Sequence, residues 1–142
     1  MGAVRNIIEG KGKAVHCTTP DNTVYDALES LEEMNVGALV VVENGRLVGI
    51  FTERDYARKV ILKGRASKET LVRDIMTERP IYVTPDSTIE HCMQLMSDKW
   101  IRHLPVLEND QVVGVISIGD VVKYIINEKD NIIRHLEHYI VS

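Results

Sequence analysis

The feature that most constrains this chain of 142 residues is an internal repeat. Residues 19–24 (TPDNTV) coincide with residues 84–89 (TPDSTI) at an offset of 65 positions, and the match continues to Asp55 and Asp120. A self-match at a fixed offset indicates two copies of one supersecondary unit. Because a unit of about 60 residues buries too little surface to be secure alone, we expect the copies to pack sheet against sheet. Function is then expected at their shared seam.

Apolar residues in the first copy have first a helical and then a strand-like spacing. The spacing predicts a helix over 24–34, which Thr23 caps through its side-chain oxygen. Short β-branched runs at 38–42 and 47–51 predict two strands, and Asn44-Gly45 between them is a strong hairpin signal. The first copy therefore predicts a helix followed by a β-hairpin.

The second copy repeats this order at the same offset. A helix is expected from Ile89 after the capping residue Thr88, followed by strands at 104–107 and 112–116. Its hairpin signal is weaker because Asp110 replaces glycine in the turn. The two copies are therefore expected to share one arrangement of elements.

Each copy also has an expected short strand before its helix and a second helix at its end. The strands are predicted at His16-Cys17 and Tyr82-Val83, and the final helices open after Thr52 and Ser117. Each unit then reads β-α-β-β-α, which places the chain in a mixed α/β (α+β) fold class.

The segments outside the two copies suggest the domain organisation. Residues 63–68 are polar and contain glycine, which is typical of a linker, and residues 71–76 predict a short apolar helix after it. We expect five segments: a helical lead-in (1–14), a first unit (15–62), a linker with a short helix (63–79), a second unit (80–127) and a helical extension (128–142).

Composition argues against several classes of protein. The apolar fraction of 44% is enough to build a core, and a net charge of -4 without a basic cluster gives no support for nucleic-acid binding. The longest uninterrupted apolar run, residues 38–42, is too short to span a membrane, and no signal-like stretch is evident. We expect a cytoplasmic protein.

Cysteine and histidine residues give no sign of a metal centre. Cys17 and Cys92 lie far apart and form no ligand motif, so we expect buried, reduced thiols. His135 and His138 could share a helix face, but no ligand set surrounds them and a metal site is not expected. No set of nucleophile, base and acid is evident, so no catalytic residue is expected.

Each copy ends its hairpin in a hydroxyl residue followed three positions later by an aspartate. Thr52 precedes Asp55, and Ser117 precedes Asp120. This pattern is typical of a helix cap, in which the hydroxyl accepts a backbone hydrogen bond and the acid sits in the first turn. The same position suits a ligand, because free amides at a helix start attract phosphate and a carboxylate can accept ribose hydroxyls. Both interpretations are open for both turns.

The two copies together resemble a known family. The segments VGALVVVENGRLVGIFTERD (36–55), IRHLPVL (101–107) and VVGVISIGD (112–120) are similar to a tandem pair of cystathionine β-synthase (CBS) domains, a Bateman module. The resemblance covers roughly residues 4–127, and DIMT (74–77) matches the family's approach to a CBS unit. It implies two repeats packed with pseudo-twofold symmetry. It also implies two clefts that in many members bind adenosine compounds such as AMP, ADP, ATP, NAD or S-adenosylmethionine.

The resemblance implies roles for the residues of the two turns. Asp55 and Asp120 would hold ribose hydroxyls, while Thr52 and Ser117 would contact ribose or phosphate. Arg54 lies in the first of these turns and would add a phosphate contact there, although a solvated arginine is the more common outcome.

Further residues carried over from the family make the two clefts unequal. Arg102 and His103 fall where family members often place phosphate-contacting side chains, whereas their counterparts Gly37 and Ala38 cannot donate charge. The adenine is expected in an apolar slot across the seam, although each of its residues is more often plain core. The slot residues are Val15, His16, Val36, Ala38 and Val115 around Asp120, and Ile50, Ile81 and Ile101 around Asp55.

The C-terminal segment predicts a contact with another surface. Apolar residues continue at 118, 122, 125, 132, 136 and 139, with Lys129 where another would fall. This spacing predicts one interrupted helix of about 20 residues. A single unit needs no helix of that length, so 132–139 is expected to meet either the other half or a second chain. Because CBS pairs commonly dimerise, the resemblance favours a homodimer.

The leading functional hypothesis is a stand-alone, non-enzymatic sensor. It would bind an adenine nucleotide such as AMP, ATP or NAD, require no obligatory cofactor, and pass its occupied state to a partner that the sequence does not identify. The rival hypothesis is a module kept for assembly or protein binding that uses no nucleotide. A third hypothesis, a nucleotide hydrolase, has less support because no catalytic motif is evident.

Overall fold

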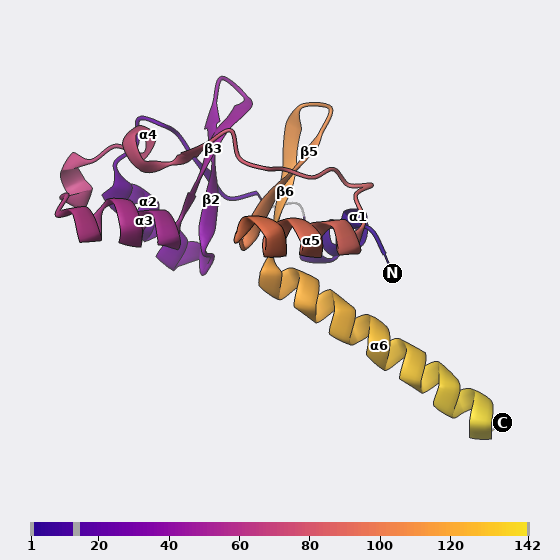
Figure 1. Ribbon diagram of the computed structural model, residues 1–142. Helices are drawn as coiled ribbons and strands as arrows, with labels where there is room; N and C mark the ends of the chain where they lie inside the picture. Colours follow the sequence, from indigo (N-terminus) through magenta and orange to yellow (C-terminus); the bar gives the residue numbers. More distant parts are fainter. Residues whose placement is uncertain (1, 13–14, 142) are drawn as a thin grey trace.

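The computed structural model describes residues 2–12 and 15–141, the last three of them as backbone. Two halves lie side by side, and a long C-terminal helix projects away from them (Figure 1). The mixed α+β class predicted from the repeat is confirmed. The described residues leave out small parts of the expected lead-in and extension, at residues 1, 13, 14 and 142. They also leave out the side chain of Tyr139, for which an apolar contact is expected.

The first half contains the helix and hairpin that its apolar spacing predicts. Its strand β1 begins one residue later than the strand expected at 16–17, pairs in parallel with β2, and β2 pairs antiparallel with β3. Thr23 caps α2 by accepting a hydrogen bond from the amide of Asp26 at 3.1 Å. The elements are β1 (Cys17–Thr18), α2 (Val24–Met34), β2 (Ala38–Glu43), β3 (Arg46–Thr52) and α3 (Glu53–Lys59).

The segment between the halves is more ordered than a plain linker. It contains η1 (Ile61–Lys63), η2 (Ser67–Glu69), α4 (Val72–Ile75) and β4 (Thr77–Glu78). β4 pairs antiparallel with β3 and completes a four-stranded sheet in the order β1-β2-β3-β4. The sequence does not predict this strand, because two residues carry no alternating pattern. β4 brings residues that precede the second repeat to the edge of the first sheet.

The second half contains α5 (Ile89–Lys99), β5 (His103–Glu108) and β6 (Gln111–Ser117). β5 and β6 pair antiparallel, with a register irregularity like that between β2 and β3. The strand expected at Tyr82-Val83 is reduced to a single parallel bridge between its second residue and Val106. Within the described residues, the second sheet therefore has two strands where the first has four.

Both hairpins turn through two residues with positive φ. Asn44 and Gly45 have φ of 53° and 77°, and Asn109 and Asp110 have φ of 53° and 62°. Two successive positive φ values are typical of the tight turns that match the twist of a hairpin. Asp110 therefore adopts a conformation that glycine adopts at lower cost, and the weaker turn signal still produces the same turn.

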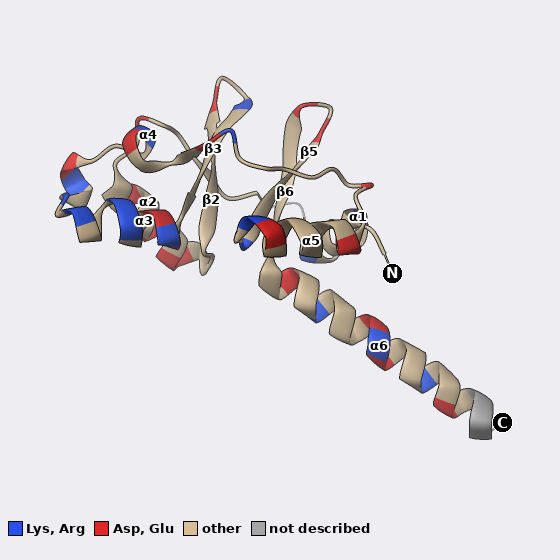
Figure 2. Ribbon diagram, in the orientation of Figure 1, with Lys and Arg blue, Asp and Glu red and all other residues tan. Residues whose placement is uncertain are grey.

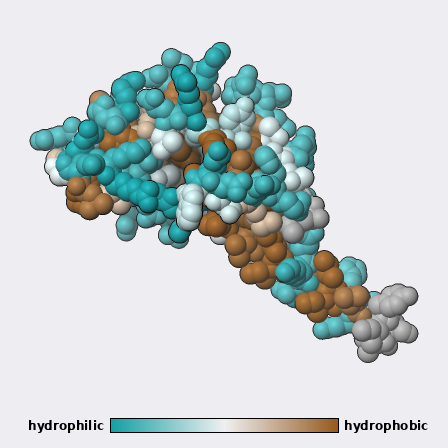
Figure 3. All heavy atoms as spheres, viewed as in Figure 1, coloured by the Kyte–Doolittle hydropathy of each residue, from teal (hydrophilic) through white to brown (hydrophobic). Residues whose placement is uncertain are grey.

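The C-terminal helix α6 (Ile118–Val141) has 24 residues and runs without the interruption that the sequence predicts. At 1.5 Å per residue it is roughly 36 Å long. Charges of both signs are spread along it (Figure 2), with hydrophobic groups between them (Figure 3). Six of its apolar side chains are about half exposed: Ile118 at 46%, Val122 at 49%, Ile126 at 53%, Ile132 at 55%, Ile133 at 51% and Leu136 at 58%.

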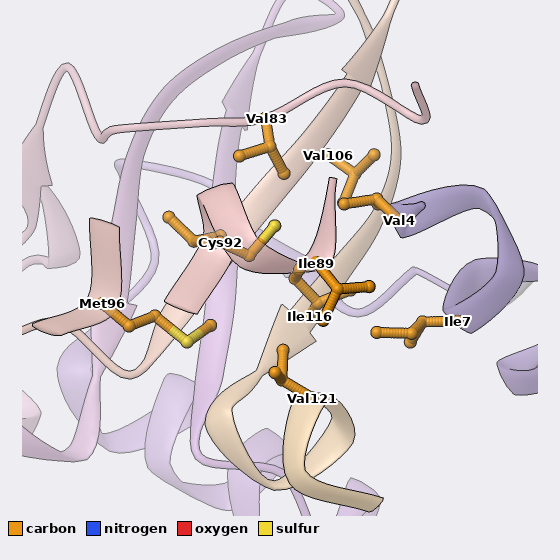
Figure 4. Close-up of a cluster of buried hydrophobic side chains, with 10 residues drawn as sticks. Val4, Ile7, Val83, Ile89, Cys92, Met96, Val106, Ile116 and Val121 are labelled. Atoms are coloured by element: carbon orange, nitrogen blue, oxygen red, sulfur yellow. The ribbon is translucent and has the colours of Figure 1, made fainter. Parts of the chain in front are cut away.

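Helix α1 (Val4–Lys11) precedes the first repeat but packs on the second. Figure 4 shows Val4 and Ile7 directed toward Ile89 and Ile116 of the second half. The backbone continues this association, because the amide of Val4 donates to the carbonyl of Ser87 at 2.9 Å. The start of α1 is therefore held against the second half.

Helix α4 stands in the same relation to the first half. Val72 and Ile75 are buried in the first core cluster with Phe51. The amide of Val72 donates to the carbonyl of Asn22 at 2.9 Å, as the amide of Val4 does to that of Ser87. Each half is thus completed by the segment that precedes the other repeat, an arrangement that neither copy predicts by itself.

The expectation of two buried thiols is wrong for Cys17. Its side chain is exposed because it points outward from β1, the edge strand of the first sheet. Cys92 lies in the second core, and burial raises the pKa of its thiol to about 11. A thiol with so high a pKa is a poor nucleophile at neutral pH, which fits a packing role.

Candidate functional site

Two cavities open at the seam between the halves. The first, of about 470 Å³, lies where β3 and β4 face the start of the second hairpin, and we name it the Thr52 cleft. The second, of about 440 Å³, lies where the end of α1 and the end of β6 face the first half, and we name it the Asp120 cleft. Both volumes fall within the range of small-molecule binding sites.

The turn at the Thr52 cleft forms a reciprocal cap. The amide of Thr52 donates to Asp55 Oδ2 at 3.0 Å, and the amide of Asp55 donates to Thr52 Oγ1 at 3.1 Å. This arrangement satisfies free donors at the start of α3 and explains why the helix begins there. The capping interpretation of the sequence is therefore correct for this turn.

The other carboxylate oxygen of Asp55 is also engaged. Thr77 Oγ1 donates to Asp55 Oδ1 at 3.1 Å, and Lys59 Nζ lies 3.1 Å from the same oxygen. Asp55 is only 7% exposed and is not among the residues that line the Thr52 cleft, whereas Thr52 and Thr77 are. The structure thus brings Thr52 to the cavity but seals the carboxylate expected to hold ribose behind its own partners.

The turn at the Asp120 cleft has the same pair of reciprocal hydrogen bonds and a different environment. The amide of Ser117 donates to Asp120 Oδ2 at 2.8 Å, and the amide of Asp120 donates to Ser117 Oγ at 3.1 Å. Lys11 Nζ donates to the same Oδ2 from α1 at 2.7 Å. Both Ser117 and Asp120 line the cavity. The Asp120 carboxylate therefore faces the cavity as an acceptor at a helix start.

The charge of Asp120 is stabilised where it lies. Burial alone would raise the pKa of this carboxyl, but hydrogen bonds from Lys11 and Ser117, together with the positive charge of Lys11, lower the pKa below its ordinary value. Asp120 is therefore ionised at neutral pH and able to accept hydrogen bonds from hydroxyl groups.

The apolar residues expected around each adenine lie around the corresponding cavity. This placement agrees with the sequence expectation for every one of them, while a role in binding stays a prediction. The Asp120 cleft is lined by Val15, His16, Val36, Ala38 and Val115, and the Thr52 cleft by Ile50, Ile81 and Ile101.

Arg54 and Arg102 line the Thr52 cleft. Arg54 is also tied to the second half, because its guanidinium donates to the carbonyl of Trp100 at the end of α5. Arg79, which the sequence does not single out, lines the same cavity from the segment after β4. Three guanidinium groups around one cavity favour a ligand with several negative charges.

His103 lines both cavities and so lies between them. Burial lowers the pKa of its imidazole below the ordinary value, and the positive charges of Lys11, Arg102 and Arg54 lower it further, against the opposing effect of Asp120. His103 is therefore neutral at physiological pH. Its counterpart in the repeat, Ala38, has no titratable group, which fits the expectation of unequal clefts.

Lys11, like Arg79, is a functional candidate that sequence reasoning missed. A signal for it exists, because VRNI at 4–7 matches VRDI at 72–75 at an offset of 68 positions. On that offset Lys11 corresponds to Arg79, and each lines one of the two cavities. The match marks the two lead-in segments as equivalent, but only the structure places Lys11 beside Asp120.

Other site classes receive no support from the described part of the chain. Within residues 2–12 and 15–141, no group of three or more His, Cys, Asp or Glu side chains could hold a metal ion. In the same residues no helix is both long and apolar enough to cross a membrane. The candidate site is therefore the pair of clefts.

Comparisons with known proteins identify the family of the repeat. A family model described as CBS domain matches residues 11–62 and 72–127. CBS domain-containing protein CBSX3, mitochondrial, of Arabidopsis thaliana is 47% identical over 96% of this chain and 71% of that protein.

Solved structures give the same fold. A protein with CBS domains from Burkholderia ambifaria, for which a role in signal transduction has been suggested, is 44% identical with a TM-score of 0.85, covering 88% of this chain and 94% of that one. The CBS domain pair of protein MJ0100, in complex with 5'-methylthioadenosine and S-adenosyl-L-methionine, has a TM-score of 0.79 over 90% of this chain and 98% of that one. At 24% identity the second likeness shows the fold alone.

Proposed function

This chain belongs to the CBS domain family, and we propose that it is a regulatory module that binds an adenosine nucleotide at the seam of its two repeats. AMP, ADP, ATP and NAD are the candidate ligands. The bound state would be passed to a partner protein through a difference in ligand affinity between two arrangements of the halves. Regulation rather than catalysis is the expected activity, since both repeats match the CBS domain.

One observation carries the proposal: the ionised Asp120 carboxylate faces a cavity at the start of α6. Ribose offers two neighbouring hydroxyls to such an acceptor. The apolar wall formed by Val36, Ala38 and Val115 suits the face of an adenine. The start of a 24-residue helix suits phosphate. Support also comes from MJ0100, which binds two adenosine compounds in the same fold.

The experiment measures binding directly. AMP, ADP, ATP and NAD are each titrated into the protein by calorimetry, and each is tested for a rise in melting temperature, which binding to the folded state must cause. Asp120→Ala is expected to weaken binding at its cleft by about 2 kcal/mol, which is roughly 30-fold in affinity. The reason is that a hydrogen bond to a charged group contributes about 1.5 to 3 kcal/mol. Asp98→Ala removes an exposed charge of the same sign on α5 and serves as the control.

The outcomes separate the proposal from its rivals. If none of the four ligands raises the melting temperature, the module is better described as an assembly or protein-binding domain. If a bound nucleotide is turned over, the protein is an enzyme. Unchanged affinity in Asp120→Ala would remove that carboxylate from the binding site.

We further propose that the protein is a homodimer whose contact includes α6. The half-exposed side chains of Ile132, Ile133 and Leu136 form one apolar face in a part of α6 that projects away from both halves. Lys129 interrupts the heptad spacing, and a polar residue at such a position is used in helix pairs to fix partner number and register. Sedimentation at micromolar concentration should show a dimer, and Leu136→Asp should shift it toward monomer.

A cytoplasmic location also stays a proposal. One relative carries mitochondrial in its name, so a mitochondrial location is the alternative. Fractionation of cells that express the tagged full chain tests it.

A further inference from the structure

The Asp120 cleft already contains a cation that the chain itself supplies. Lys11 Nζ lies 2.7 Å from Asp120 Oδ2 and 2.9 Å from the carbonyl oxygen of Val115. Among the described residues that line this cleft, Lys11 is the one ammonium group and Asp120 the one carboxylate. The internal ion pair therefore engages Oδ2, one of the two oxygens of the carboxylate that a ribose would need.

Helix α1 holds the backbone of Lys11 in place while the side chain stays free to turn. Val4 is fully buried and Ile7 is 6% exposed in the second core, and Ile8 packs against Gly114. The side chain of Lys11 is 43% exposed at the end of the helix. A lysine side chain has four rotatable bonds and ends in an ammonium group with three donor hydrogens. The ammonium group can therefore change acceptors without movement of the helix.

A second observation points to the same position. Under the 68-residue match of the lead-in segments, Lys11 corresponds to Arg79, and Arg79 lines the Thr52 cleft. Both clefts therefore receive a cationic side chain from the segment that precedes the opposite repeat. The repetition of charge at equivalent places favours a shared role toward an anionic ligand over an incidental ion pair.

We propose that Lys11 determines ligand specificity in the Asp120 cleft by exchanging Asp120 for the phosphate of the entering nucleotide. This inference rests on the proposed function. Ribose hydroxyls take the acceptor that Lys11 leaves, and the ammonium group pairs with the phosphate. A nucleoside without phosphate displaces Lys11 and gives it no new acceptor. The cleft is thereby selective for phosphorylated ligands of the AMP class.

The test compares AMP with adenosine in the full-length protein. Binding is followed by NMR at the backbone amides of Val36, Ala38 and Val115, which line this cleft and not the other. The measured quantity is the ratio of the adenosine dissociation constant to that of AMP. In Lys11→Met this ratio is expected to fall by about tenfold, because AMP loses a charge-assisted contact while adenosine no longer displaces an ion pair.

Matched variants make the result specific. Lys63→Met removes the same charge from an exposed position in η1 outside both cavities and should leave the ratio unchanged. Lys11→Arg keeps a cation and should retain most of the preference for AMP. Lys11→Gln provides a second neutral variant, and circular dichroism with thermal melting establishes that each variant is folded.

Each outcome has one meaning. A preference for AMP that is the same in Lys11→Met and in the unchanged protein overturns the role of Lys11 while leaving nucleotide binding intact. Equal weakening of AMP and adenosine in Lys11→Met also overturns it, since the lysine would then act on the nucleoside or the fold. If neither ligand shifts the three amides in the unchanged protein, the proposed function of this cleft fails instead.

Discussion

The two hydroxyl-aspartate turns are nearly identical locally and differ in what surrounds them. In both, the aspartate amide donates to the hydroxyl oxygen at 3.1 Å, and the carboxylate accepts from the amide of the hydroxyl residue. The other carboxylate oxygen of Asp55 accepts a hydrogen bond from Thr77 and pairs with Lys59. Asp120 meets Lys11 and faces a cavity. One local motif thus forms a sealed cap in one repeat and an open acceptor in the other.

The difference follows from the lead-in segments that cross between the halves. On the 68-residue match, Thr77 corresponds to Glu9, so the hydroxyl that covers Asp55 has no equivalent beside Asp120. β4 also extends the first sheet next to β3, whereas α1 reaches the second hairpin as a helix. Repeats of similar sequence can therefore present different sites when the segments that complete them differ.

The largest effect that would test this contrast is on stability. Asp55→Ala is expected to lower the free energy of unfolding by about 3 kcal/mol. The substitution removes a helix cap and leaves the part-buried donors of Thr52 and Thr77 without their acceptor. Asp120→Ala should cost only about 1 kcal/mol, since its carboxylate is partly solvated. Urea unfolding of both variants measures the difference. Equal losses would show that the two turns are equally structural, while Asp55→Asn tests how much of the effect depends on charge.

A smaller effect is expected at the two glycines where the lead-in segments approach the hairpins. A Cβ on Gly49 would lie 2.9 Å from the carbonyl oxygen of Thr77, which is held by strand pairing. At Gly114 it would meet only the end of the Ile8 side chain, which can rotate. Gly49→Ala should therefore lower the free energy of unfolding by about 2 kcal/mol. Gly114→Ala should lower it by less than about 1 kcal/mol.

Thermal or urea unfolding of these glycine variants checks the order. A larger loss in Gly114→Ala would mean that α1 is packed more rigidly than β4. That result would also argue against the proposal that the Lys11 side chain exchanges acceptors at the end of α1.

The smallest effect concerns pH, because His103 has no titratable counterpart in the first repeat. Burial lowers the pKa of folded His103 below 6.5, its ordinary value. As pH falls through this value, the unfolded chain takes up a proton that the folded protein does not, so stability decreases toward acid. His103→Gln should reduce this decrease between about pH 7.5 and about pH 5.5 in urea unfolding. An unchanged slope would assign the acid sensitivity to other groups.

Much of the fold can be predicted from particular residues. Thr23 and Thr88 cap α2 and α5 as expected, accepting from the amides of Asp26 and His91 at 3.1 Å. The hairpins lie where the β-branched runs predict them, because alternation and turn residues act within a few positions. The strand at Tyr82-Val83 is mostly lost, since so short a segment depends on its neighbours rather than on its own pattern.

The candidate site can be predicted only in part. The residues that line each cleft agree with those that the family resemblance implies, from Ile50 and Ile81 on one side to Val36 and Val115 on the other. The exposure of Asp55 cannot be predicted, because it depends on Thr77, which lies 22 positions away in a strand with no pattern of its own.

The sequence by itself determined the repeat, the order of helices and strands, the caps and the family. These features depend on spacing and on neighbours within a few residues, which a sequence displays directly. Only the tertiary structure decided that α1 completes the second half, that α4 and β4 complete the first, and that Lys11 meets Asp120 across 109 positions. Such contacts arise where two buried surfaces match in shape and charge, and no single segment carries that information.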